Sequence, residues 1–216
     1  RFTIKGTAQV KSNVYGGAGS GHVQKDAHVI IEGGTIGIEN HGGWHSNVYG
    51  GGGGQQQYVR NSSTNPPTMH HSITAGRVYG NTKVEISGGQ IMHNVYGGGA
   101  IASVGTYNIY STTPEGLFKP GTGDTKVTIT GGTIGTNGNE NGMVFGSGRG
   151  QIAPVGAFMD SLTYAVHTVV NIGKETTPDS GSYEGTAKIK GSVYGSGENG
   201  HVFKNATVNV YSGTIG

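Results

Sequence analysis

A short phrase, Asn-Val-Tyr-Gly-Gly, recurs along this chain of 216 residues and constrains its fold more than any other feature. Complete copies stand at 13–17, 47–51 and 94–98, and degenerate copies at 143–146 and 192–195. A second phrase, Val-x-Ile-x-Gly-Gly-x-Ile, alternates with the first at 29–36, 84–91 and 127–134, and in relaxed form at 208–215. Such self-similarity is typical of repeat architectures, in which each unit buries its apolar face against the next.

The two ends of the chain also resemble each other. Residues 7–37 align without a gap on residues 186–216, at a constant offset of 179 residues and with about half of the positions identical. Either the chain is a window from a longer array, or its two ends are structurally equivalent surfaces.

Composition narrows the classes of function. Glycine accounts for 44 residues, but the glycines are periodic and alternate with Val/Ile segments, which indicates ordered turns rather than disorder. Charged residues make up only 12% of the chain and the net charge is +2, so we expect no nucleic-acid partner. There is no cysteine to form a disulfide or a thiolate metal site. No apolar run is long enough to span a bilayer, so we expect no membrane insertion.

Between the glycines lie short β-branched segments that alternate with period two. They place Val and Ile on one face and Lys, Glu, Thr and Asn on the other. The strand anchors Val84, Val127 and Val170 are 43 residues apart each time. This pattern predicts an all-β, parallel β-solenoid that forms a single domain over 1–216. The inward-pointing positions would be Val29, Ile31, Val84, Ile86, Val127, Ile129, Val170, Ile172, Val208 and Val210. An antiparallel sandwich is the alternative, but it does not require one phrase to recur in register.

The aromatic position of the first phrase predicts a ladder of stacked rings. Its members would be Tyr15, Tyr49, Tyr96, Phe145 and Tyr194. The ladder could be structural packing or, alternatively, a sugar-binding strip, because aromatic faces serve both purposes.

The alternation of Val-Tyr-Gly-Gly-Gly with Val-x-Ile-x-Gly-Gly-Thr-Ile resembles the giant adhesin-like β-helix repeat proteins of gut and oral anaerobic bacteria. The resemblance covers most of the chain outside its insertions. It implies a secreted, right-handed parallel β-helix on a cell-surface stalk or fibre. It implies no catalytic residues.

Long insertions interrupt the middle copies at one point. The distance from the valine of the first phrase to the next strand anchor is 15 residues in the first and last copies, and 36, 32 and 26 residues in the middle ones. The insertions span 55–75, 100–123 and 151–167, and a further one spans 37–46. Because insertions at equivalent positions should lie side by side, we expect them on one side as a composite face that binds a glycan or a protein.

The candidate ligand-binding residues of these insertions are aromatic: Trp44, Tyr58, Tyr107, Tyr110, Phe158 and Tyr164. Two alternatives remain open. The insertions could instead be lateral caps that pack on the flank of the fold. Trp44 could be a buried anchor rather than a platform for a sugar ring.

The sequence offers little catalytic or metal-binding chemistry. The histidine clusters at 41–45 and 70–71 have no acidic residue at matching spacing, so we expect no metal and no cofactor. A carbohydrate-active β-helix enzyme, a polysaccharide lyase or hydrolase, is the alternative function. Its best candidate group is Asp124, Arg149 and Asp160, which share no motif and could equally be solvated loop charges. We therefore predict no catalytic residue.

These observations predict a non-enzymatic structural or adhesive protein that is extracellular or lies on the cell surface. Its partners would be a glycan or a host or bacterial surface ligand. We also expect a rod or filament, built by head-to-tail self-association or by continuation into further repeats, because strand-like sequence lies at both ends of the chain.

Overall fold

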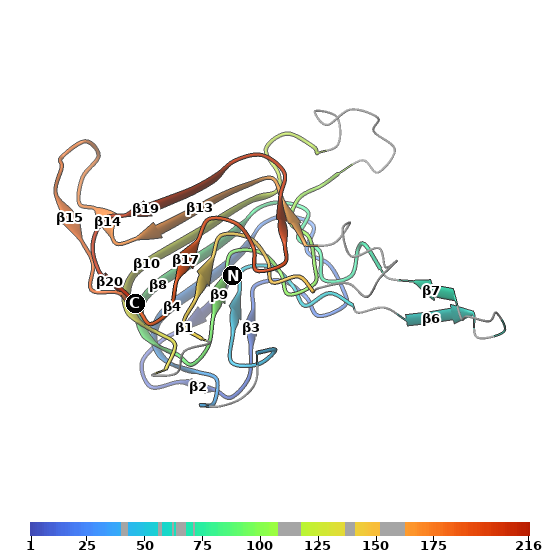
Figure 1. Cartoon of the computed structure of the whole chain (residues 1–216), viewed down its shortest axis with the longest axis horizontal. Helices are drawn as coiled ribbons and strands as arrows, with labels where there is room; N and C mark the ends of the chain where they lie inside the picture. The colour runs from blue at the N-terminus through green and yellow to red at the C-terminus, as the bar shows by residue number, and fades with distance from the viewer. Residues whose placement is uncertain are drawn as a thin grey trace.

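The computed structural model describes residues 1–39, 43–55, 58–61, 63, 68–70, 72–107, 118–136, 141–151 and 163–216. Within these ranges the protein is all-β, without a helix, and its sheets are mostly parallel (Figure 1). The all-β prediction is confirmed. No described segment is a helix that could cross a membrane.

A long parallel sheet collects the second phrase from each copy. Its main strands are β1 (Phe2–Ile4), β4 (Ala27–Ile36), β8 (Thr82–Ile91), β10 (Asp124–Ile134), β13 (His167–Ile172) and β19 (Ala206–Val210). They lie side by side in chain order, and the short strands β2 (Gln9–Val10), β16 (Lys188–Ile189) and β20 (Thr214–Ile215) extend the sheet (Figure 1). The anchors Val84, Val127 and Val170 are direct register partners. This parallel pairing contradicts the antiparallel sandwich.

A short parallel sheet collects the first phrase in the same manner. Its strands are β3 (Val14–Tyr15), β5 (Val48–Tyr49), β9 (Val95–Tyr96), β11 (Val144–Phe145) and β17 (Val193–Tyr194). They also pair in chain order, with valine opposite valine.

A third parallel stack completes the arrangement. It runs from Val23 to Val78 and Val104 through parallel bridges, and Val104 N–H donates to the carbonyl of Tyr164 at 2.8 Å. Tyr164 begins β12 (Tyr164–Ala165), which pairs with β18 (His201–Val202). Each copy of the sequence therefore contributes one segment to each of three parallel stacks.

Two antiparallel hairpins interrupt this pattern. β6 (Tyr58–Asn61) pairs with β7 (Thr68–His70) inside the first insertion and projects away from the sheets (Figure 1). β14 (Lys174–Glu175) pairs with β15 (Tyr183–Glu184) near the C-terminus. Both hairpins are additions to the parallel stacks rather than parts of them.

The core follows the alternation of the strands, with one correction. Eight of the ten expected core residues are buried: Val29, Ile31, Val84, Ile86, Val127, Ile129, Val170 and Ile172. The expectation of burial is wrong for Val208 and Val210, which are 39% and 56% exposed. They pair with buried Val170 and Ile172 and so lie on the core face. They are exposed because β19 has a described strand partner on one side only.

Threonine lies on both faces of the long strands, which is a second correction to the expectation that it lies outward. Thr82, Thr125 and Thr168 stand two residues before a valine anchor and share its face, and each is at least 97% buried. Their hydroxyl groups donate to the carbonyl oxygens of Gly97, Gly146 and Gly195, the first two at 2.6 and 2.5 Å. Each threonine thus links the long sheet to the short sheet and satisfies a buried backbone acceptor.

The glycine of the first phrase allows the backbone of adjacent copies to approach closely. A Cβ atom at Gly50 would collide with the carbonyl oxygen of Gly97, and one at Gly97 with that of Gly146. Neither obstacle is a flexible side chain, so only glycine fits these positions.

The asparagine of the phrase connects neighbouring copies. Asn13 Oδ1 accepts a hydrogen bond from Asn47 N–H at 2.9 Å, and Asn47 Oδ1 accepts one from Asn94 N–H at 3.0 Å. Asn94 Oδ1 accepts from Met143 N–H at 2.9 Å, although Met143 has replaced the asparagine of its own copy. Each asparagine therefore fixes the position of the next copy.

Candidate binding face

The second and third insertions bring aromatic side chains together beside the third stack. We call Tyr107, Phe118, Tyr164 and Phe203 the insertion cluster. Tyr107 and Phe118 form an antiparallel bridge at the base of the second insertion, with ring centroids 5.7 Å apart. Phe118 lies 4.9 Å from Phe203 and 6.4 Å from Tyr164, with interplanar angles of 54° and 59°. The rings meet at steep angles because they do not repeat one position on adjacent parallel strands, and two of them come from an antiparallel bridge.

The insertion cluster is open to solvent around a buried centre. Phe118 is only 7% exposed, whereas Tyr107, Tyr164 and Phe203 are half-buried. Half-buried rings with phenol hydroxyls offer both apolar faces and hydrogen-bonding groups to a ligand. His201 extends this surface, since its ring lies 5.1 Å from that of Tyr164.

Arg77 is a buried cation at one end of the insertion cluster. It is 3% exposed, and its guanidinium carbon lies 3.6 Å from the centroid of the Tyr107 ring and 5.4 Å from that of Tyr79. Its Nε–H donates to the Gly105 carbonyl at 2.9 Å, while its Nη2 has no hydrogen-bond partner among the described residues. Burial lowers the pKa of Arg77, and the nearby tyrosines act in the opposite direction. A buried donor without a partner is costly, and the contact of the guanidinium with the face of the Tyr107 ring offsets part of that cost.

The pKa of Tyr107 is shifted in the opposite direction to that of Arg77. Burial raises the pKa of its phenol, and the adjacent Arg77 partly opposes that rise. The phenol therefore stays protonated at neutral pH and can act as a hydrogen-bond donor or acceptor.

The first-phrase aromatic residues form a separate group, here called the aromatic ladder: Tyr15, Tyr49, Tyr96, Phe145 and Tyr194. Adjacent rings are stacked, with centroids 4.9 to 5.0 Å apart and interplanar angles of 5° to 10°. The spacing is close to the distance between strands, because each ring comes from the same position of neighbouring strands. Tyr49 and Tyr96 are fully buried.

Trp44 packs on the aromatic ladder and not in the insertion cluster. Its ring is half-buried and lies 3.5 Å below the guanidinium carbon of Arg149. Its carbonyl accepts a hydrogen bond from Asn13 Nδ2 at 2.7 Å. The insertion that carries Trp44 is thus attached by apolar packing on the ladder and by the hydrogen bond from Asn13.

The phenol of Tyr96 joins the aromatic ladder to a polar network. Tyr96 O–H donates to Glu198 Oε2 at 2.5 Å, and Arg149 Nε lies 3.6 Å from the same oxygen. Burial raises the pKa of Tyr96, and the bond to Glu198 raises it further. Burial also raises the pKa of Tyr49, whose hydroxyl has no described partner. These phenols are poor candidates for a general base, which needs a pKa near the working pH.

The other residues predicted for ligand binding or catalysis do not belong to the insertion cluster as described. Tyr58 lies in the β6–β7 hairpin, while Tyr110, Phe158 and Asp160 fall outside the described residues. Asp124 is exposed at the start of β10, and Arg149 is engaged by Trp44 and Glu198. In the described part of the chain, no three His, Cys, Asp or Glu side chains are grouped to hold a metal ion.

Sequence reasoning missed Arg77 and Phe203 as members of this face. A signal for Arg77 existed, because 78–80 reads Val-Tyr-Gly and is a further copy of the first phrase. This copy belongs to the third stack rather than the short sheet. Phe203 directly follows β18, whose pairing with β12 places it near Phe118.

Comparison with known proteins adds no relative: no family model, curated protein or solved structure matches the chain at a significant level.

Proposed function

We propose that the protein is an extracellular or cell-surface structural and adhesive protein, a rod that binds a glycan or another protein through the insertion cluster. The observation that carries the adhesive role is the insertion cluster itself. It presents half-buried rings, and one of them, Tyr107, lies against the guanidinium of the buried Arg77. Aromatic and arginine side chains dominate the energy of many binding sites.

The rod is a right-handed parallel β-solenoid in this proposal. Support comes from the three parallel stacks, to each of which successive copies contribute in chain order. The right hand follows from the general rule that crossovers between parallel strands of one sheet are right-handed in about 98% of cases.

The rod extends at its ends, either by covalent continuation into further copies or by head-to-tail association. Val210 at one end of the long sheet is 56% exposed, and Tyr194 at one end of the ladder is 44% exposed. At the other end of the long sheet, Phe2 is 43% exposed. Exposed strand edges with apolar side chains are a template for pairing with a further strand.

The alternative function, a carbohydrate-active enzyme, has less support from the described side chains. The phenols of the aromatic ladder have raised pKa values, and Arg149 is engaged by Glu198 and Trp44. Neither the ladder phenols nor Arg149 is therefore available as a catalytic base or acid beside an open substrate site.

Glycan-array binding of the whole chain tests the adhesive role. We expect Tyr107→Ala to weaken the binding of the best ligand about tenfold, since one lost aromatic contact of about 1.4 kcal/mol corresponds to that factor. Tyr183→Ala is the control, because Tyr183 is an exposed tyrosine of the β14–β15 hairpin, outside the insertion cluster. Equal loss in both variants, or depolymerisation of a polysaccharide by the unmodified chain, would contradict the proposal.

Electron microscopy of the native protein tests the rod. We expect elongated particles or fibres. Their length should increase with the number of repeat copies in the native chain or with the number of chains joined end to end. Discrete compact monomers at high protein concentration would contradict it.

A further inference from the structure

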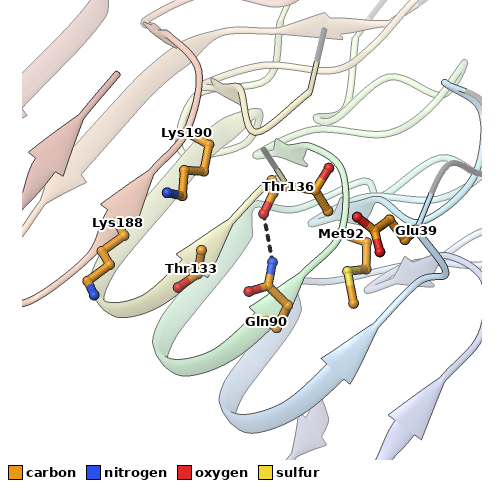
Figure 2. A pocket seen from close by; sticks show the side chains of 8 residues that line it. Glu39, Gln90, Met92, Thr133, Thr136, Lys188 and Lys190 are labelled. Atoms are coloured by element: carbon orange, nitrogen blue, oxygen red, sulfur yellow. Dashed lines mark hydrogen bonds between the residues drawn. The ribbon is translucent and has the colours of Figure 1, made fainter. Parts of the chain in front are cut away.

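A second concave surface lies at the ends of the long-sheet strands and contains none of the insertion cluster (Figure 2). It consists of two adjoining cavities of about 410 and 360 Å³, which share Glu39 and Met92 in their walls. We call this surface the lysine groove. Its other principal lining side chains are Lys11, Gln90, Thr133, Thr136, Lys188 and Lys190.

The strand register builds the lysine groove as a row. Thr35, Gln90, Thr133 and Lys188 occupy the same position in neighbouring parallel strands. Neighbouring strands lie about 4.8 Å apart, so a polar side chain recurs at that interval across the sheet. This interval is close to the length of one pyranose ring in an extended polysaccharide.

The centre of the lysine groove is ordered in advance and holds one carboxylate, that of Glu39, which lines both cavities. Gln90 Nε2 donates to the carbonyl oxygen of Gly135 at 2.7 Å (Figure 2). It also donates to the carbonyl oxygen of Ile91 at 3.1 Å, and the two bonds fix the amide. Its Oε1 receives no hydrogen bond from a described residue and remains an acceptor for a ligand hydroxyl. Thr133, on the adjacent strand, adds a hydroxyl that can donate or accept.

Positive charge lies at both ends of the lysine groove. Lys11 lies at one end, and Lys188 and Lys190 lie at the other. All three side chains are exposed, and none forms an ion pair within the described part of the chain. Glu39 is the one carboxylate in the described lining, so the lysines outnumber the acids.

The distance between the two ends sets the length of a ligand. Lys190 N–H bonds to the carbonyl of Ile134, and Gly135, Met92 and Gly37 make the equivalent bond in the preceding copies. Lys11 follows the Val10 carbonyl that Gly37 contacts, so Lys11 and Lys190 are four strands apart, or about 19 Å.

We propose that the lysine groove binds a linear acidic polysaccharide that lies across the strands. Its hydroxyl groups would bond to Gln90 and Thr133, and its carboxylates or sulfates would pair with Lys11 at one end and with Lys188 and Lys190 at the other. A single-stranded nucleic acid fits less well, because the described lining has no aromatic side chain on which a base can stack. This site is independent of the insertion cluster, so either proposal can fail alone.

Calorimetry of the whole chain with polygalacturonate oligomers of graded length is the first test, with a sulfated linear glycan as a second probe. We expect affinity to rise with oligomer length until one molecule reaches both ends of the groove, and then to level off. Fully methyl-esterified oligomers of the same length lack the charge and should bind at least about tenfold more weakly. Inorganic sulfate should bind more weakly still, because it reaches only one end.

Matched charge variants locate the site. We expect the double variant K188Q/K190Q to lose about tenfold in affinity, since charge-assisted hydrogen bonds are among the stronger ones. The control K25Q/K204Q removes the same charge from exposed lysines outside the groove and should change affinity less than about twofold. Circular dichroism checks that both variants are folded.

Three results would overturn the proposal. The first is an equal loss in both double variants, or equal affinity for a thymidine homopolymer, which indicates non-specific attraction of polyanions. The second is equal binding of charged and methyl-esterified oligomers. The third is no binding of either acidic probe at low salt.

Discussion

The aromatic ladder and the insertion cluster use the same kinds of side chain but differ in geometry. Ladder rings lie within 10° of parallel and 5.0 Å of each other, whereas Phe118 meets its neighbours at 54° to 62°. The ladder is held by register, since each ring repeats one position of the phrase on adjacent parallel strands. The insertion cluster repeats no such position: Tyr107 and Phe118 are joined by an antiparallel bridge, and Phe203 follows the strand that pairs with the strand of Tyr164.

This difference in geometry indicates that the aromatic ladder is part of the scaffold and the insertion cluster is part of the surface. Each of the three interior rings of the ladder has a stacking partner on both sides, so removal of one of them disrupts two contacts and the backbone spacing around it. In the insertion cluster Tyr107, Tyr164 and Phe203 keep part of their faces in solvent, around the buried Phe118. We therefore expect changes in the ladder to affect stability and changes in the insertion cluster to affect binding.

The largest effect should come from Gly97→Ala beside the ladder. The new Cβ atom would collide with the carbonyl oxygen of Gly146, and the backbone there cannot move without breaking the register. We expect a loss of about 3 kcal/mol or more in the free energy of unfolding, measured by urea titration. Gly121→Ala in the second insertion is the comparison, since only its φ of +73° opposes a side chain and no atom lies within 4 Å. Its loss should be about 1 kcal/mol; similar losses in the two variants would contradict the comparison.

Removal of one ring from each group is the next test. Tyr96→Ala should lower the free energy of unfolding by about 3–5 kcal/mol, because the ring is fully buried between two others. Tyr107→Ala should lower it by about 1–2 kcal/mol, since the ring is half-buried. The fluorescence of Trp44, the single tryptophan, reports unfolding at the ladder. If Tyr107→Ala proved the more destabilising, the insertion cluster would be part of the core.

A smaller effect is expected from Thr125→Val, which keeps the side-chain shape but removes the hydroxyl. The carbonyl of Gly146, next to the ladder, would lose its bond from Thr125. We expect a loss of about 1–2 kcal/mol in urea titration. Thr128→Val is the control, because Thr128 is half-exposed on the opposite face of the same strand. No difference between the two variants would mean that water satisfies the Gly146 carbonyl.

The smallest expected effect is a dependence on pH near the ladder. Burial lowers the pKa of His93, whose Nδ1 lies 2.7 Å from Asn47 Oδ1. The unfolded state therefore takes up a proton at a higher pH than the folded state, so stability present above the ordinary histidine pKa declines as the pH falls through and below it. Urea midpoints between pH 7.5 and 5.0 measure this slope. His93→Gln should flatten it, whereas His22→Gln, which changes an exposed histidine, should not. An unchanged slope in His93→Gln would assign the dependence to another group.

Sequence periodicity allowed much of the scaffold to be predicted. The alternation in each strand identified eight buried core residues, and the recurrence of the first phrase identified the ladder positions as equivalent. The candidate binding residues were harder to predict, because insertions carry no period. Tyr107 and Tyr164 both belong to the insertion cluster, but Trp44 packs on the ladder, and nothing in the spacing of the insertions separates these two outcomes.

The sequence by itself determined the all-β class and the positions that share a face, because a period-two pattern and a repeated phrase are properties of the chain alone. Only the tertiary structure decided burial. Val208 is exposed because its strand has one described neighbour, while Thr125 is buried because the short sheet supplies an acceptor for its hydroxyl. The tertiary structure likewise places Arg77 against Tyr107 and Arg149 against Trp44. The physical reason is that burial and pairing depend on which segment lies across the register, and a local pattern does not contain that information.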